Sequence, residues 1–199
     1  MFDLLKRDFE DVEWTSGDWS QFYPDIKQND EPIPTNMPEP RGKSIQINMF
    51  CDASHASCLQ SRRSTTGIIF FLNGAPITWY SKRQNTIESS AFGSEFVALK
   101  IATEMNEGIR YKLRMMGLPI DGPTNCFCDN QSVVTNVSNP ESVLNKKHNA
   151  IAYHKVRESV AQGTQRVTHE RGINNLSDCL TKFLGPLEFR NCIECILFR

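Results

Sequence analysis

The sequence predicts an α/β fold built on a five-stranded mixed sheet flanked by helices. Its first half contains three strand-like segments joined by short connections, which favours an antiparallel meander. Its second half alternates strand-like with helical segments, which is typical of strands added in parallel. With 199 residues, the chain is long enough for one domain of roughly 150 residues and an appendage.

The first three strands are indicated by side-chain alternation and by one turn. In residues 45–54 apolar and polar side chains alternate, and Asp52 closes this strand on its more polar face. Residues 65–72 form a near-continuous apolar run, which indicates a buried strand. An Asn-Gly pair then suits a two-residue hairpin, because both residues tolerate positive φ, and residues 76–82 return as the third strand.

A long helix follows, capped by Ser89 or Ser90 and ending near Gly117. Its predicted buried stripe has helical spacing and contains Phe92, Phe96, Leu99, Ala102, Met105, Ile109, Leu113 and Met116. Glu95 lies on the same side of this helix. Because burying a bare charge is costly, a carboxylate in this stripe requires a partner.

The remaining elements are a strand, a short helix, a longer helix, a strand and a final helix, at residues 124–129, 130–138, 148–163, 164–170 and 176–184. Pro140 separates the two middle helices, since proline breaks a helix interior. Asn174 or Asn175 caps the final helix, which ends at Gly185-Pro186.

The chain divides into three predicted regions. Residues 1–44 form an acidic, proline-rich leader or linker, residues 45–187 the domain, and residues 188–199 a C-terminal tail. The apolar tail forms a short strand or helix on the core, or a surface for a partner. Aromatic residues of the leader dock either on the domain or on a neighbouring protein: Trp14, Trp19, Phe22 and Tyr23.

Charge is unevenly distributed, although the net charge is only −1. Residues 1–40 carry ten acidic and three basic residues, a balance of −7. Residues 41–199 carry thirteen acidic and nineteen basic residues, a balance of +6. A basic surface around an acidic centre suits a polyanionic substrate, while ordinary scatter of solvated charges explains the balance equally well.

The sequence favours an intracellular protein, in a cytoplasmic particle or in the nucleus, with no membrane partner. No segment approaches the ~18 apolar residues that span a bilayer. Acidic residues interrupt the first dozen positions, which argues against a secretory signal there. The seven cysteines show no regular framework, as is typical of a reducing compartment.

Four acidic residues stand at junctions between predicted elements: Asp52, Glu95, Asp129 and Asp178. Carboxylates so placed can converge on one edge of a sheet, where they repel one another unless divalent cations neutralise them. Each acid also has a simpler explanation, respectively a strand-end turn, an ion pair, a helix cap and a favourable position in the helix dipole. One shared cause explains all four, so metal-assisted phosphate chemistry is the leading hypothesis.

Six segments carry a resemblance to a known family: CDASHA, TTGIIFFLNGAPITWYSKRQ, SSAFGSEFVAL, CDNQSVV, KKHNAIAYHKVRE and NLSDCLTK. In this order they resemble the ribonuclease H domain of copia-type retrotransposon polyproteins. The resemblance implies a ribonuclease H-like fold and Mg²⁺-dependent cleavage of the RNA strand of an RNA–DNA hybrid. It also implies two Mg²⁺ ions, for which Mn²⁺ substitutes, and a reverse transcriptase region of the parent polyprotein as a partner.

The resemblance places the family's metal-binding acids on the four residues named above. It implies that Asp52 bridges two ions and that Glu95 and Asp129 hold the ion beside the leaving oxygen. Asp178 would hold the ion that activates the attacking water. The products would carry 5′-phosphate and 3′-hydroxyl ends.

Seven further residues are candidates for contact with nucleic acid or for an auxiliary role: Arg62, Arg63, Asn130, Gln131, Lys147, His148 and His169. Gln131 is expected to reach a base edge or a 2′-hydroxyl. The arginine pair suits a phosphate, and the Lys-His pair a basic helix edge. His169 either assists product release, as a histidine does in cellular ribonucleases H, or is a strand-end residue. The alternative for Arg62 and Arg63 is a charged turn before the second strand, and that for Gln131, Lys147 and His148 is plain surface solvation.

Two rival functions stay open. A DNA nuclease, recombinase or integrase of the same fold also uses clustered carboxylates and metals, and a comparison of hybrid with duplex cleavage separates the two. The non-enzymatic rival is a catalytically silent, retrotransposon-derived domain that only binds nucleic acid. The presence of all four acids disfavours this second rival.

Overall fold

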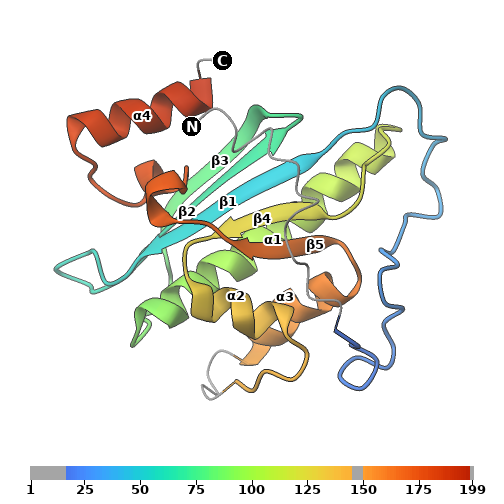
Figure 1. The fold of residues 1–199 in the computed structure, drawn as a ribbon, viewed down its shortest axis with the longest axis horizontal. Coiled ribbons are helices and arrows are strands. Elements are labelled where there is room, and N and C mark those ends of the chain that lie inside the picture. Colours follow the sequence, from blue (N-terminus) through green and yellow to red (C-terminus); the bar gives the residue numbers. More distant parts are fainter. Residues whose placement is uncertain (1–16, 145–149, 198–199) are drawn as a thin grey trace.

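A computed structural model describes residues 17–144 and 150–197. Its centre is one sheet with the strand order β3-β2-β1-β4-β5 (Figure 1). The strands are β1 (Ile47–Ser54), β2 (Thr65–Leu72), β3 (Ala75–Arg83), β4 (Thr124–Cys128) and β5 (Gln165–His169). β1, β2 and β3 pair antiparallel, whereas β4 pairs parallel with β1 and β5 parallel with β4. The predicted five-stranded mixed sheet is therefore confirmed.

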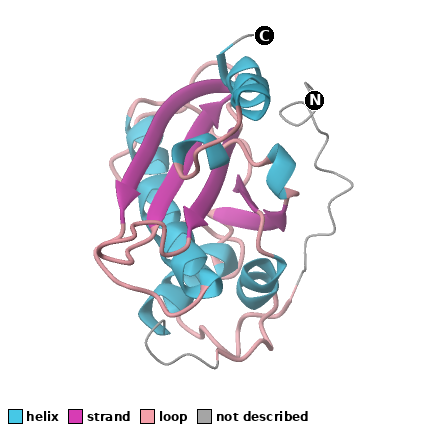
Figure 2. Cartoon of the chain, turned by 90° about the vertical axis from the view of Figure 1, so that its left-hand side faces the viewer, coloured by secondary structure: helices cyan, strands magenta, loops and turns pink. Residues whose placement is uncertain are grey.

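Helices cover both faces of this sheet (Figures 1 and 2). The α-helices of the described ranges are α1 (Ala91–Met115), α2 (Gln131–Ser138), α3 (Ala150–Ala161) and α4 (Pro186–Leu197). The first three lie on one face and α4 lies on the other (Figure 1). None of the described helices is both long and apolar enough to cross a bilayer.

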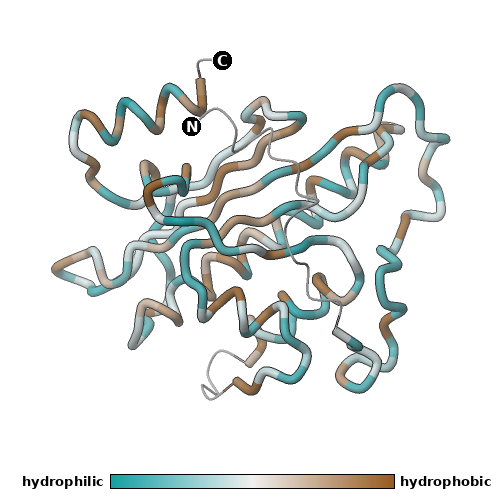
Figure 3. The backbone as a smooth tube through the Cα atoms, viewed as in Figure 1, coloured by the Kyte–Doolittle hydropathy of each residue, from teal (hydrophilic) through white to brown (hydrophobic). Residues whose placement is uncertain are grey.

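Each face of the sheet has its own hydrophobic core, because successive side chains of a strand point to opposite faces. Met49 and Cys126 pack toward α1, together with Phe96. Their neighbours Phe50 and Phe127 stack on each other on the α4 face, with ring centroids 4.6 Å apart. The hydropathy of the backbone reflects this arrangement, since apolar residues concentrate in the central strands (Figure 3).

The predicted cap of α1 and the predicted turn between β2 and β3 are both present in the structure. The Ser90 side chain caps α1 by accepting a hydrogen bond from the Gly93 N–H at 3.2 Å. Asn73 and Gly74 both have positive φ, 47° and 87°, as a two-residue hairpin turn requires. Met116, however, is 73% exposed instead of buried, because α1 ends one residue before it.

The prediction of a final helix over residues 176–184 is wrong. Within this range the chain forms one short 3₁₀ helix, η4 (Asp178–Leu180), which follows another, η3 (Gly172–Asn174), and α4 begins only at Pro186. The Asn175 side chain accepts hydrogen bonds from the N–H and hydroxyl of Ser177, a local pattern that competes with a regular helix. Pro186 stands at the first helical position, where its missing N–H costs nothing.

The C-terminal tail, as far as it is described, is part of α4. Cys192 and Ile196 of this helix are buried against the sheet. Among the alternatives for the tail, the structure therefore shows a helix on the core.

The leader packs against the domain. Trp19 and Tyr23 are only 4% and 9% exposed and contact Ala161 at the end of α3. The guanidinium carbon of Arg157 lies 4.8 Å from the centroid of the Trp19 ring. The aromatic cluster thus docks on its own domain, although Trp14 lies outside the described residues and Phe22 is exposed.

A buried ion pair fixes the leader a second time, against α1. Glu31 accepts hydrogen bonds from Arg110 at 2.7 and 2.5 Å and a further, short one from Arg114. The Arg110 side chain is only 2% exposed and also donates to the Thr124 hydroxyl at 3.1 Å. The leader therefore neutralises a cation that α1 buries inside the domain.

Candidate metal centre

Two of the predicted site residues lie side by side where the parallel pairing of β1 and β4 ends. Cys51 of β1 pairs with Cys128 of β4, and Asp52 and Asp129 are the next residues along the chain. Asp52 faces the α4 side, because the residue two positions earlier belongs to that core. Its side chain is only 2% exposed, and that of Asp129 is 17% exposed.

Asp178 reaches this place at the start of η4, on the α4 side of the sheet. The Asn175 side-chain amide donates a hydrogen bond to the backbone oxygen of Cys51 at 3.1 Å. Asn175 and Ser177 are both buried. The segment before Asp178 is therefore attached directly to β1, at the residue before Asp52.

The close approach of η4 to the sheet depends on a glycine in β2. Gly67 pairs with Asp52 across the two strands. A Cβ at Gly67 would lie 2.5 Å from Cγ2 of Thr181 and 2.8 Å from the backbone oxygen of Ser177. Because such distances are shorter than real contacts of a Cβ atom, only glycine allows η4 to lie this close to Asp52.

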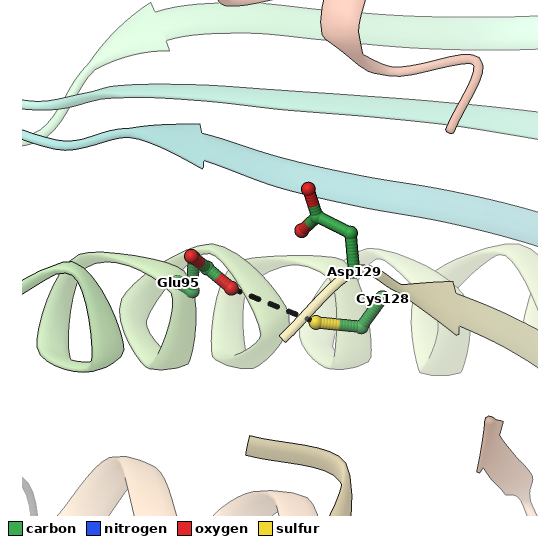
Figure 4. A group of neighbouring side chains, drawn as sticks. All are labelled: Glu95, Cys128 and Asp129. Atoms are coloured by element: carbon green, nitrogen blue, oxygen red, sulfur yellow. Dashed lines mark hydrogen bonds between the residues drawn. The ribbon is translucent and has the colours of Figure 1, made fainter. Parts of the chain in front are cut away.

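The fourth acid approaches from the other face of the sheet. Glu95 belongs to α1, and its Oε2 lies 4.0 Å from the Cys128 sulfur (Figure 4). The side chains of Cys128 and Asp129 leave the chain in opposite directions (Figure 4). Glu95 therefore meets Asp129 from the α1 side, past the end of β4.

The acids form two overlapping groups. Ligand atoms of Asp52, Asp129 and Asp178 all lie within 4.8 Å of one another, and those of Glu95, Cys128 and Asp129 do the same. Asp129 is common to both groups. Its Oδ1 is buried and has no hydrogen-bond partner, which is costly for a carboxylate unless a cation binds there.

A lysine lies among three of the carboxylates. The Lys182 ammonium is 2.9 Å from Asp178 Oδ1, 3.4 Å from Asp52 Oδ2 and 4.0 Å from Asp129 Oδ2. No Lys or Arg in the described parts of the chain forms an ion pair with Glu95. An ion pair therefore explains part of the cluster, but one ammonium cannot neutralise four carboxylates.

Burial and mutual repulsion raise the pKa of three of these acids, Glu95, Asp129 and Asp178. Burial and then the charge of Asp129 raise the pKa of Glu95 to about 7. Burial raises the pKa of Asp178 to about 6, although its hydrogen bond from Lys182 acts in the opposite direction. Burial and the charge of Asp52 raise the pKa of Asp129 as well. These raised pKa values are typical of carboxylates crowded at a functional site.

Three of the other candidates border the acid cluster. Asn130, not Asp129, caps α2, because its side-chain oxygen accepts hydrogen bonds from two N–H groups of the first turn at 3.0 and 3.2 Å. A ring nitrogen of His169 lies 3.2 Å from the backbone oxygen of Asp129. Gln131 is exposed at the start of α2, and with His169 it lines a cavity of about 680 Å³.

The remaining candidates are not brought into the cluster. Arg62 and Arg63 are exposed in the loop between β1 and β2, where Arg62 has a φ of 55°. This loop follows the strand that carries Asp52. Lys147 and His148 lie outside the described residues.

Several residues that shape the site were missed from the sequence: Gly67, Gln84, Asn175, Thr181 and Lys182. Gln84 connects β2 to the start of α1, because its amide donates to the Thr66 hydroxyl and to the Ser94 backbone oxygen at 3.0 and 2.7 Å. The sequence contained signals for two of these residues, Gly67 and Lys182. A glycine inside an apolar strand marks a close approach, and Lys182 follows Asp178 by four positions.

Comparison with solved structures identifies the class of this fold. Ribonuclease H1 from the halophilic archaeon Halobacterium salinarum NRC-1 superposes with a TM-score of 0.53 at 14% identity, over 68% of this chain and 94% of that chain. LC11-RNase H1, solved in complex with an RNA/DNA hybrid, gives a TM-score of 0.54 at 14% identity, with the same coverage. The chain therefore has the ribonuclease H fold.

Sequence relatives then define the particular family. Retrovirus-related Pol polyproteins from the Arabidopsis thaliana transposons RE2 and RE1 are each 30% identical over 151 residues, 76% of this chain. The polyprotein from the Nicotiana tabacum transposon TNT 1-94 is 28% identical over 155 residues. The chain therefore resembles the ribonuclease H domain of retrotransposon Pol polyproteins. It spans about a tenth of the length of these relatives, and no family model matches it.

Proposed function

We propose that this domain hydrolyses the RNA strand of RNA–DNA hybrids, with divalent metal ions held by Asp52, Glu95, Asp129 and Asp178. The observation that carries the proposal is the meeting of these four acids, from four separate segments, at the end of the parallel strands of a ribonuclease H fold. Repulsion between the clustered carboxylates destabilises the folded protein, so the cluster indicates a function and not a structural need.

The residues present fit divalent cations. Carboxylate oxygens are the ligands that Mg²⁺ and Mn²⁺ prefer, and the buried, unpartnered Oδ1 of Asp129 is an open ligand position. Bound ions would activate water and neutralise charge that develops on the phosphodiester. The chain itself orients the ligands: the Thr181 hydroxyl donates a short hydrogen bond to Asp52, and the segment of Asn175 positions Asp178.

The polar residues around the acids suit an RNA-containing duplex. Gln131 and Asn130 lie at the start of α2, next to Asp129, within reach of a 2′-hydroxyl or a base edge. Arg62 and Arg63 would bind a phosphate from the exposed loop, and Lys147 and His148 would add a basic edge. His169, beside Asp129, is proposed to assist release of the product.

The parent protein and its setting are also proposals. The relatives are Pol polyproteins, so we infer that a reverse transcriptase region of such a polyprotein is a partner of this domain. An intracellular setting is proposed because all seven cysteines are free thiols.

The decisive experiment is cleavage of a labelled RNA–DNA hybrid with Mg²⁺, with Mn²⁺ and with a chelator. We expect cleavage only with the metals, and RNA products with 5′-phosphate and 3′-hydroxyl ends. Asp52→Asn and Asp129→Asn should each lower the rate at least about 100-fold, because each removes a carboxylate that would hold the metal ions, and these ions would stabilise the transition state. Asp121→Asn is the matched control, since Asp121 is an exposed acid that precedes β4.

The same assay separates the rival functions. Cleavage of duplex DNA in preference to the hybrid would identify a DNA nuclease or integrase. Hybrid binding without cleavage by any metal-loaded form would identify a silent binding domain. The ion pairs of Lys182 are the observation that favours this last alternative, because they already neutralise part of the site.

A further inference from the structure

The Lys182 ammonium occupies the position between the carboxylates where a metal ion would bind. Its ammonium contacts Asp178 Oδ1 at 2.9 Å and both carboxylate oxygens of Asp52 at 3.4 Å, and it lies 4.0 Å from Asp129 Oδ2. These are the three acids whose ligand atoms lie within 4.8 Å of one another. A single ammonium therefore stands where three potential metal ligands converge.

The backbone that carries Lys182 is fixed, whereas its ammonium is free to leave. The Ser81 hydroxyl donates to the backbone oxygen of Leu180 at 2.7 Å, and Gly67 allows Thr181 to lie directly on β2. The Lys182 side chain is 38% exposed at the surface. Because four flexible carbons connect a lysine ammonium to its backbone, rotation of the side chain alone moves the charge into solvent.

We propose that Lys182 is an exchangeable counter-cation, which holds the acids together in the metal-free protein and leaves them when a divalent ion binds. This inference rests on the proposed function, because it assumes the metal centre described there. It makes Lys182 a positioning residue that sets the concentration of metal at which the site is loaded.

Charge balance favours exchange over permanent pairing. With all four acids ionised, Lys182 leaves three negative charges uncompensated. Two divalent ions supply four positive charges, which balance the four acids without the lysine. Lys182 is therefore needed next to the acids only while the metal is absent.

The test measures Mn²⁺ binding by calorimetry, without nucleic acid and with no dependence on cleavage. Removal of a positive charge a few ångströms from the ligands should tighten Mn²⁺ binding by Lys182→Met about tenfold or more. Lys182→Arg, which keeps the charge, should restore an affinity near that of the wild type. Lys100→Met is the matched control, because Lys100 pairs with Glu104 on α1 and should leave Mn²⁺ affinity unchanged.

A second measurement is independent of any variant. In a crystal structure of the wild-type protein with Mn²⁺, the ammonium should have left Asp52 and Asp178. Unchanged Lys182 contacts around a bound ion, or equal Mn²⁺ affinity of Lys182→Met and wild type, would overturn the exchange while hybrid cleavage still supported the proposed function. Absence of Mn²⁺ binding to the wild type would overturn both.

Discussion

At the scale of single residues, the site is defined by carboxylates that hold their protons more tightly than ordinary acids. The pKa of Glu95 is raised to about 7 and that of Asp178 to about 6, mainly by burial. Metal ligands must be ionised, so proton release and the proposed metal binding would be linked at these positions. Binding of Mg²⁺ should therefore strengthen as the pH rises through this range.

This linkage predicts how the stability of the metal-free protein depends on pH. A carboxyl with a raised pKa contributes stability below its ordinary pKa and loses it as the pH rises through the folded value. The melting temperature in the presence of a chelator should therefore fall as the pH rises from 4.5 to about 7, the window that Glu95 defines. Thermal unfolding followed by circular dichroism at a series of pH values measures it.

Glu95→Gln provides the comparison for this pH dependence. The variant should have a flatter profile, because the amide does not ionise, whereas Glu104→Gln on the exposed side of α1 should follow the wild type. A profile for Glu95→Gln as steep as that of the wild type would assign the pH dependence to other groups.

The convergence of the four acids could be predicted from the sequence, because each lies near the end of a strand or in the first turns of a helix, and such positions meet at one end of the sheet. The split into two groups could not, since it depends on which face of the sheet each side chain approaches. The position of Lys182 could not be predicted either. Its spacing of four residues from Asp178 indicates that it neighbours Asp178, but it does not indicate that it neighbours Asp52. Asp52 and Lys182 are 130 positions apart and meet only through the packing of η4 on β2.

At the scale of elements, the contact of η4 with β2 decides where Asp178 lies. Gly67→Ala would place a methyl group 2.5 Å from Thr181 Cγ2, so η4 must move away from the sheet. We expect a lower melting temperature and at least about tenfold weaker Mn²⁺ binding, since misplaced ligands lose affinity. Calorimetry and thermal unfolding measure both effects.

Gly108→Ala is the matched control for this substitution. Gly108 is exposed within α1, and nothing lies within 4 Å of the Cβ that alanine would add. Alanine should stabilise this helix by roughly 0.5–1 kcal/mol without changing Mn²⁺ binding. Normal metal affinity in Gly67→Ala would show that η4 does not need this close approach.

The elements with strong periodicity were predictable, and the segment after β5 was not. Alternation in β1, the apolar run of β2 and the Asn-Gly turn each have a local cause. The pattern around residues 176–184 is also helical, but the interactions of Asn175 with Cys51 and Ser177 outweigh it. Pro186 is compatible with both the end and the start of a helix, so it could not decide between them.

At the scale of the whole molecule, the leader contributes to the stability of the domain. Glu31, in the described part of the leader, pairs with Arg110, which is buried and would otherwise carry an uncompensated charge. Burial alone would raise the pKa of Glu31, but hydrogen bonds from Arg110 and Arg114 hold it below its ordinary value. We propose that a stable domain requires this segment, in addition to residues 45–187.

Glu31→Gln tests this role of the leader. Removal of one partner of a buried ion pair should lower the free energy of unfolding by about 3 kcal/mol, measured by denaturant titration. Lys27→Ala is the control, because its pair with Asp30 is exposed and should contribute at most about 1 kcal/mol. Equal stabilities of the two variants would indicate that the leader is only a linker.

The arrival of acids from both faces has a mechanical consequence for the whole domain. Glu95 belongs to the layer of α1, whereas Asp178 belongs to the layer that α4 completes, and the sheet separates them everywhere except at its end. Ions bound by the two groups, which have Asp129 in common, would cross-link the two layers. Chelation should then uncouple the layers, so that hydrogen exchange in η4 becomes faster while exchange in the centre of α1 stays slow.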